Sequence, residues 1–185
     1  MSIIEIKMAL DSFAEMNFLS VGVVALFIFF ILYFILKLIV KRQEQKITVV
    51  KFLLLILLSI YVALLLGGTI LGRVPGTKGD VELIPFWSYI RLLEEKNYNL
   101  LRQMIGNVLV FIPWPILWGS IFPTMRRFRW GVGSALLFSI FIEVTQLVFK
   151  LGLFEFDDMF HNVLGAVIGY GIYHFFWLKK SQKNE

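Results

Sequence analysis

The sequence predicts an all-α fold: a polytopic integral membrane helix bundle of about five transmembrane helices with a short N-terminal interfacial helix. Hydrophobic residues make up 58% of the 185 residues and charged residues only 17%, and the mean hydropathy is +0.79. A soluble domain of this size has too little interior to bury that much apolar surface. The apolar residues also fall in long runs rather than in the alternation of a membrane β-barrel, so the spans are predicted to be helices.

Five apolar segments are candidates for these spans. A helix that crosses a bilayer needs about 20 apolar residues; four segments meet that length, and the last is slightly short. The segments are 18–36 (continuing to Val40), 52–72, 103–125, 130–149 and 162–178. Pro113 and Pro115 are predicted to kink the third of them. They divide the chain into an interfacial segment (1–17), a first span with a basic loop (18–51), a membrane domain of four spans (52–178) and a basic tail (179–185).

The interfacial segment is predicted from its periodicity. Ile3, Ile6, Leu10 and Phe13 repeat at steps of three and four residues, which gives one apolar face to a short helix before the first span.

The basic residues predict the orientation of the spans. They gather in the link between the first two spans, in the tight link at 126–129 and in the tail. Loops rich in Lys and Arg stay in the cytoplasm. The N-terminus and the loops 73–102 and 150–161 are therefore predicted to lie outside and the C-terminus inside. The net charge of +5 is thus a topology signal, and nothing in the sequence indicates nucleic-acid binding.

One carboxyl stands inside the fourth span. Glu143 lies in an otherwise uncharged run, 130–149, with Gln146 three residues later and Ser139 four residues earlier. Helical spacing places the three side chains on one face. A charged group within the membrane costs about 2.5–3.5 kcal/mol or more, so it persists where it faces protein or water and has a partner. The face is either a proton-handling or ligand-binding site, or a buried hydrogen-bond clamp between helices.

Other polar residues are predicted to converge with Glu143 on the outer leaflet. With the predicted orientation, four spans each bring polar side chains to that side. This cluster consists of Arg73, Asn107, Glu143, Gln146, Asp158 and Asn162. Below Asp158 and Asn162, Gly165 and Gly169 form a small-residue face that allows close helix packing, and the fourth span is the expected partner of that face.

Several of these side chains have a simpler interpretation. Asn107 could orient a substrate or be a helix cap, and Arg73 could grip a phosphate, pair with an acid or anchor a helix at the interface. Asp157, Asp158 and His161 could bind a hard cation. We favour Asp158 as a helix cap and ion-pair partner and Asp157 as a solvated loop acid, because no complete ligand set is visible. No metal and no cofactor are expected, and the lack of cysteine excludes thiolate chemistry.

Short motifs in residues 70–175 resemble those of the VanZ-like family. They are Arg73, Leu83-Ile84-Pro85-Phe86, Asn107-Val108-Leu109-Val110-Phe111-Ile112-Pro113, Glu143-x-x-Gln146 and Phe156-Asp157-Asp158-x-x-x-Asn162-x-x-Gly165. The resemblance implies a small bacterial plasma-membrane protein linked to resistance to the glycopeptide teicoplanin. Pro115 stands where the family usually has glycine, and 152–154 lacks the family's arginine, which makes Arg73 more important as a partner for Asp158.

Three classes of function compete. The first is a non-catalytic envelope factor that binds a lipid-linked precursor, an amphiphile or a partner, and we prefer it. The second is an intramembrane enzyme acting on a lipid-phosphate or peptidoglycan precursor, with Glu143 and Asp158 as its catalytic candidates. The chain lacks G-x-S-x-G and H-E-x-x-H motifs, which weakens the enzyme hypothesis. The third is a small transporter, against which the sequence shows no inverted repeat.

Overall fold

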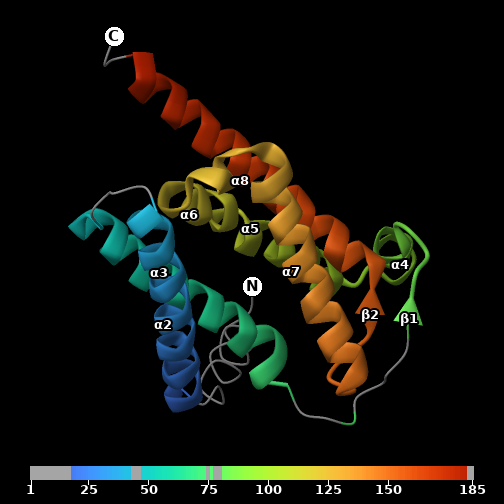
Figure 1. Ribbon diagram of the computed structural model, residues 1–185. Helices are drawn as coiled ribbons and strands as arrows, with labels where there is room; N and C mark the ends of the chain where they lie inside the picture. The colour runs from blue at the N-terminus through green and yellow to red at the C-terminus, as the bar shows by residue number, and fades with distance from the viewer. Residues whose placement is uncertain (1–17, 43–46, 74–75, 77–80, 183–185) are drawn as a thin grey trace, which may run out of the picture. The chain divides into compact units, whose positions relative to one another are not determined.

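The computed structural model describes residues 18–42, 47–73, 76 and 81–182. The chain divides into two compact units, Met1–Thr77 and Lys78–Glu185, and both are built almost entirely of helices (Figure 1). The boundary falls inside the predicted membrane domain 52–178. The predicted interfacial segment 1–17 lies outside the described residues.

Four helical stretches in the described residues are long and apolar enough to cross a membrane. They are Leu19–Lys41, Val49–Leu71, Tyr98–Ile121 and Phe128–Val148. The predicted class, an all-α membrane helix bundle, is therefore confirmed. The fifth predicted span lies within α8 (Phe156–Gln182), whose 27 residues extend about 40 Å. This helix is not among the four, since His161, Asn162 and His174 interrupt its apolar sequence.

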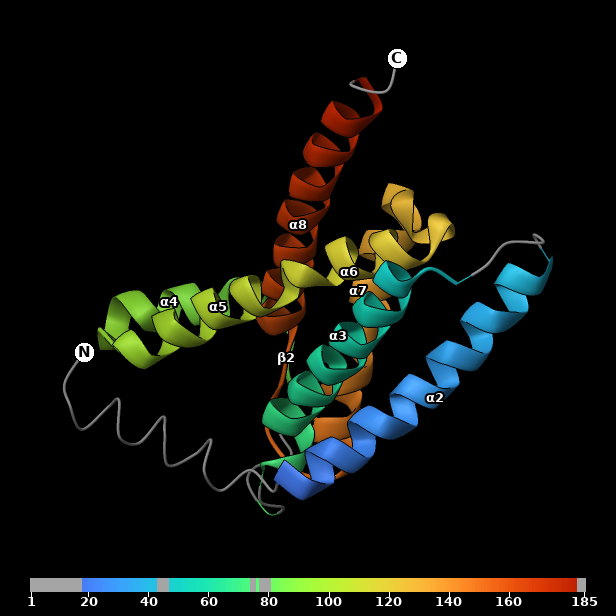
Figure 2. The same cartoon turned by 90° about the vertical axis from the view of Figure 1, so that its left-hand side faces the viewer.

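The first unit is a helical hairpin of α2 (Phe18–Arg42) and α3 (Val49–Leu66), which pack against each other at an angle (Figures 1 and 2). Phe52 of α3 packs edge-on against Phe29 of α2, with ring centroids 5.6 Å apart. α3 begins where the Thr48 side chain accepts the N–H of Lys51 at 3.3 Å, a regular N-terminal cap.

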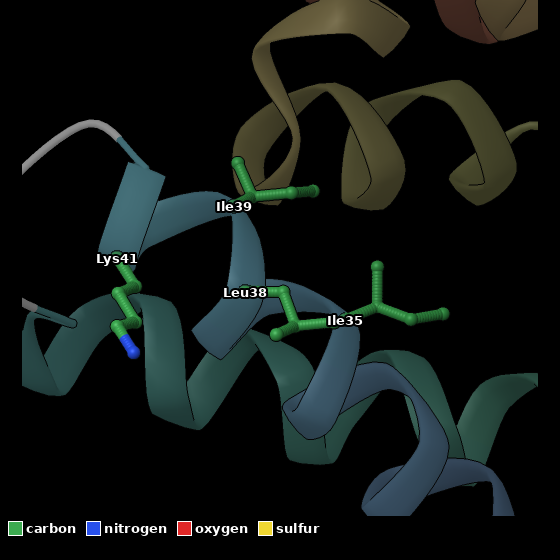
Figure 3. A pocket seen from close by; sticks show the side chains of 4 residues that line it. All are labelled: Ile35, Leu38, Ile39 and Lys41. Carbon is green, nitrogen blue, oxygen red and sulfur yellow. The ribbon is translucent and has the colours of Figure 1, made fainter.

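A pocket lies along the last turns of α2. Figure 3 shows its lining residues Ile35, Leu38, Ile39 and Lys41. One ammonium beside three apolar side chains is typical of a helix end at the membrane surface, where a lysine stem lies in the apolar layer and its charge reaches water. The location agrees with a span that ends near residue 41.

The second span ends in a wider helical turn that the sequence did not predict. The π-helix η1 (Gly67–Leu71) continues α3, and Thr69 Oγ1 donates to the Leu65 carbonyl at 2.6 Å. Paired glycines at 67 and 68 lower the cost of leaving the α-helical conformation. Arg73 follows this turn directly and is exposed.

The second unit contains three long helical stretches joined by short loops. Its elements are β1 (Val81–Glu82), α4 (Trp87–Glu95), α5 (Tyr98–Phe111), α6 (Pro113–Ile121), η2 (Pro123–Arg126), α7 (Phe128–Val148), β2 (Phe154–Glu155) and α8. α8 packs against α5, α6 and α7. Its C-terminal part projects beyond them (Figures 1 and 2).

Two prolines break the third span, as the sequence predicts. α5 ends at Phe111 and α6 begins at Pro113, with Ile112 in the break, because proline supplies no N–H to the preceding turn. α5 also begins earlier than expected: the Asn97 side chain caps it by accepting the N–H of Asn99 at 3.1 Å. Asn107 therefore lies in mid-helix, and its interpretation as a cap was wrong.

The glycine face of α8 packs on the third span. A Cβ on Gly165 would collide with the carbonyl oxygen of Val108, and one on Gly169 with that of Ile112. The fourth span was therefore the wrong partner for this face. Because Gly165 and Gly169 have no side chains, the backbones of α8 and the third span can approach closely, which strengthens their packing.

A short parallel strand pair joins the two loops at one end of this unit. Val81 pairs with Phe154 and Glu82 with Glu155. No signal in the sequence indicated these two-residue strands. They hold residues 81–82 beside residues 154–155, so each of the two loops predicted to lie outside contributes one strand.

A buried polar cluster as the candidate functional site

The predicted polar face of α7 is buried. Ser139, Glu143 and Gln146 are only 0%, 2% and 3% exposed, and helical spacing places them in one stripe. The three side chains therefore share one buried face of α7, as their spacing indicates. The opposite faces of α7, represented by Leu137 and Phe141, are exposed, as suits a helix in contact with lipid.

α8 supplies the second side of the buried polar cluster, whose members are Ser139, Glu143 and Gln146 of α7 and Asp157, His161 and Asn162 of α8. Asn162 is buried and its Nδ2 donates to Ser139 Oγ on α7 at 2.8 Å. This bond joins two predicted site faces that are 23 residues apart in sequence. Interhelical polar bonds of this kind hold membrane helices together. The Oδ1 atom of Asn162 is buried and has no hydrogen-bond partner among the described residues.

Glu143 connects its span to the loop strands. Its Oε2 accepts the backbone N–H of Glu155 at 3.1 Å, and Glu155 belongs to β2, which pairs with β1. A carboxylate accepts a backbone N–H more strongly than a neutral oxygen does. The geometry thus gives Glu143 a positioning contact on the loop, which sequence reasoning did not foresee.

Asp157 is buried at 2% exposure, so its interpretation as a solvated loop acid was wrong. Its Oδ1 accepts the N–H of Phe86 at 2.7 Å and its Oδ2 the N–H of Ser88 at 2.8 Å. These N–H groups lie at the start of α4, where helix geometry leaves donors without intrahelical partners. Asp157 therefore caps a helix that is 69 residues away from it in sequence.

Helix α4 also brings Tyr89 to the cluster. Tyr89 Oη lies 2.8 Å from His161 Nε2, and His161 is almost fully buried. Burial lowers the pKa of His161 below its ordinary value, while the charge of Asp157 opposes the shift. Burial, assisted by the Asp157 charge, raises the pKa of Tyr89. At neutral pH the pair is therefore a neutral imidazole and a neutral phenol.

Asp158 has a partner that sequence reasoning missed. Gln103 Nε2 donates to Asp158 Oδ2 at 3.2 Å and also to Glu155 Oε2 at 3.1 Å. Asp158 does lie in the first turn of α8, as predicted. A signal for Gln103 was present, because it precedes Asn107 by four residues and therefore shares its helix face.

Asn107 lies one turn along α5 from Gln103. Contacts pair Gln103 with Asp158 and Val108 with Gly165, so the register of the two helices places Asn107 level with Asn162. Its Nδ2 is buried and has no hydrogen-bond partner among the described residues. A donor on Asn107 and an acceptor on Asn162 thus face the interior at one level of the unit, and buried polar atoms of this kind normally bind a partner.

Arg73 belongs to the first unit, whereas the other five predicted site residues belong to the second. Its pairing with the cluster stays a prediction. Within the ranges the structure describes, no group of three or more His, Cys, Asp and Glu side chains is placed to hold a metal ion.

Fold and cluster together define a class: a polytopic helical membrane protein with a buried polar cluster where its connecting loops meet. A sequence profile of the VanZ/LLP1 family matches residues 52–177, more than half of the chain, and the chain belongs to this family. It is similar to Protein VanZ of Enterococcus faecium, with 31% identity over 72 residues, which is 39% of this chain and 44% of that protein. The chain thus matches less than half of that relative's length. No solved structure matches the chain.

Proposed function

We propose that this chain is a non-catalytic cell-envelope protein of the bacterial plasma membrane that binds the polar part of a lipid-linked envelope precursor or similar amphiphile. Through this binding it contributes to resistance to the glycopeptide teicoplanin. Membership of the VanZ/LLP1 family supports the resistance role. The orientation we propose has the N-terminus outside and the C-terminus in the cytoplasm, so that the buried polar cluster opens toward the outer leaflet.

The complementary atoms on Asn107 and Asn162 carry the proposal. Asn107 Nδ2 can only donate and Asn162 Oδ1 can only accept, and both are buried without a partner among the described residues. A hydroxyl or an amide on a ligand both accepts and donates, so one such group satisfies the two atoms together. A peptidoglycan precursor carries sugar hydroxyls and peptide amides among its polar groups, which gives the proposal its ligand class.

The contact of Glu143 supports a positioning role. Glu143 Oε2 accepts the Glu155 N–H, whereas a general base must also reach the proton that it removes from a substrate. Glutamine retains a carbonyl oxygen for that bond but cannot take up a proton. Glu143→Gln therefore separates the two functions, because a positioning role tolerates the change and a general-base role does not.

The test expresses the full chain in a glycopeptide-susceptible Gram-positive strain and measures the minimum inhibitory concentration of teicoplanin. We expect the wild type and Glu143→Gln to raise it, and Asn107→Ala to lose the gain, since one hydrogen bond to the ligand is worth about fivefold in affinity. Asn99→Ala, which removes an exposed asparagine from the first turn of the same helix, is the matched control. All variants are compared at equal membrane abundance.

Three results would overturn the proposal. One is a wild-type chain that leaves susceptibility unchanged. Another is Asn107→Ala performing as well as Asn99→Ala. The third is a loss of resistance in Glu143→Gln at normal abundance, which would instead support the intramembrane enzyme.

A further inference from the structure

The turn between the third and fourth spans is strongly basic. Arg126, Arg127 and Arg129 fall within four residues. The sequence contains no acidic residue between Glu95 and Glu143, so neither of the two flanking helices α6 and α7 neutralises the turn from its own side chains near this end. Arg127 and Arg129 are exposed.

The backbone of this turn is held by α8. Tyr173 Oη donates to the Gly119 carbonyl at 3.0 Å and Tyr170 Oη to the Arg126 carbonyl at 3.3 Å. Arg126 itself uses its Nε to donate to the Gly119 carbonyl at 3.2 Å, so its guanidinium serves as a cap for the end of α6. The other two arginines are thus displayed from a fixed backbone rather than from a loose loop.

The position of the turn fixes its depth in the membrane. The candidate spans Tyr98–Ile121 and Phe128–Val148 end and begin on its two sides, which leaves only residues 122–127 outside them. Phe128 and Trp130 are 52% and 48% exposed, and the guanidinium of Arg129 lies 5.5 Å from the centre of the Trp130 ring. Exposed aromatic residues beside arginines are characteristic of the level of lipid headgroups.

We propose that Arg127 and Arg129 form a binding site for the phosphate of an anionic phospholipid, with Phe128 and Trp130 in contact with its upper acyl chains. Guanidinium groups suit phosphate oxygens. α7 begins at Phe128 without a side-chain cap and without an acidic residue in its first turn, so the positive end of the helix adds to the same field. The adjoining aromatic surface at headgroup depth selects a lipid over a soluble phosphate.

The site is separate from the buried polar cluster. Arg127 and Arg129 lie at the N-terminal end of α7, whereas Glu143 and Gln146 lie near its C-terminal end, about 20–30 Å away along the helix axis. Lipid binding at this turn is therefore independent of the proposed role in resistance, and either can fail without the other.

The experiment uses native mass spectrometry of the full chain in detergent, titrated with phosphatidylglycerol, phosphatidylcholine or inorganic phosphate. We expect bound phosphatidylglycerol on the wild type and no comparable binding of the other two. Arg127→Gln/Arg129→Gln should weaken that binding by about 30-fold, because each basic residue at an anionic surface contributes about fivefold. Arg91→Gln/Arg102→Gln removes the same charge elsewhere in the second unit and should bind as the wild type does.

The double variant Arg127→Lys/Arg129→Lys controls for a folding defect in the glutamine variant. It keeps both charges and should therefore retain most of the binding. Equal losses in the two glutamine pairs, or equal binding of phosphatidylcholine, would overturn the proposal. Saturation by inorganic phosphate alone would also overturn it, by showing a site for the soluble anion. Loss of binding in the lysine pair together with a lowered melting temperature would show a structural role for the arginines and would contradict the site.

Discussion

Asp157 at the start of α8 accepts a hydrogen bond from the backbone N–H of Ser88 at 2.8 Å, across 69 residues of sequence. Its other carboxylate oxygen accepts the N–H of Phe86, whose backbone is in the left-handed conformation with φ of 63°. A non-glycine residue in this region is uncommon and needs support from its surroundings. One side chain thus both caps α4 and fixes the turn before it.

Removing this cap should loosen α4. Asp157→Ala leaves two helix N–H groups without their acceptor, and we expect it to cost about 2 kcal/mol, whereas Asp157→Asn retains one acceptor oxygen and costs less. Hydrogen exchange at residues 88–95 measures the effect, with faster exchange expected in the order alanine, asparagine, wild type. Glu94→Gln, an exposed acid in the same helix, is the control. Equal exchange in Asp157→Ala and Glu94→Gln would show that the cap does not hold α4.

The glycines of α8 provide a matched pair for testing the close helix contact. Gly165→Ala places a methyl group on the Val108 carbonyl, whereas a Cβ at Gly171 meets nothing within 4 Å. We expect Gly165→Ala to lower the free energy of unfolding by about 1–3 kcal/mol through overpacking. Gly171→Ala should be neutral or slightly stabilising, since alanine favours the helix. Unfolding by SDS titration in micelles compares them, and equal stability of the two variants would contradict the packing.

Local patterns in the sequence predicted the helices well. Uncharged runs placed the first four spans to within a few residues, and Pro113 with Pro115 predicted the break in the third. The face of Ser139, Glu143 and Gln146 followed from spacing alone. These features depend on residues that are close in sequence, so helical periodicity and proline chemistry are enough to predict them.

Contacts between distant segments could not be predicted in the same way. Asp157 was assigned to solvent because nothing near it in sequence shows that the start of α4 lies against it. The glycine face was paired with the wrong span for the same reason, because small residues predict a close partner but not which one. Both errors came from tertiary proximity, and no local propensity encodes that.

His161 predicts a pH dependence of stability. Burial lowers its pKa in the folded chain below the usual value near 6.5, so the unfolded chain binds its proton more readily. The contribution of His161 to the free energy of unfolding is therefore fully present above about pH 6.5. It falls as the pH drops below that value toward the lowered pKa of the folded chain. We expect the melting temperature, followed by the fluorescence of the five tryptophans, to be lower at pH 5.5 than at pH 7.5.

His161→Gln should flatten this dependence because it removes the titrating imidazole. His174→Gln, which removes the second histidine of α8, controls for the loss of an imidazole in general. A slope between pH 7.5 and 5.5 that is as steep in His161→Gln as in the wild type would assign the dependence to other groups.

The orientation can be tested within the second unit, because the chain contains no cysteine. Residues 94 and 124 are both exposed, and they lie on opposite sides of the span Tyr98–Ile121. Three arginines follow Thr124 within five residues, and translocating such a loop opposes the charge rule that keeps Lys and Arg in the cytoplasm. An impermeant maleimide applied to intact cells should therefore label Glu94→Cys and leave Thr124→Cys unlabelled. In permeabilised cells both positions should be labelled, which controls for the reactivity of each cysteine. Labelling of position 124 alone in intact cells would reverse the topology and place the buried polar cluster on the cytoplasmic side.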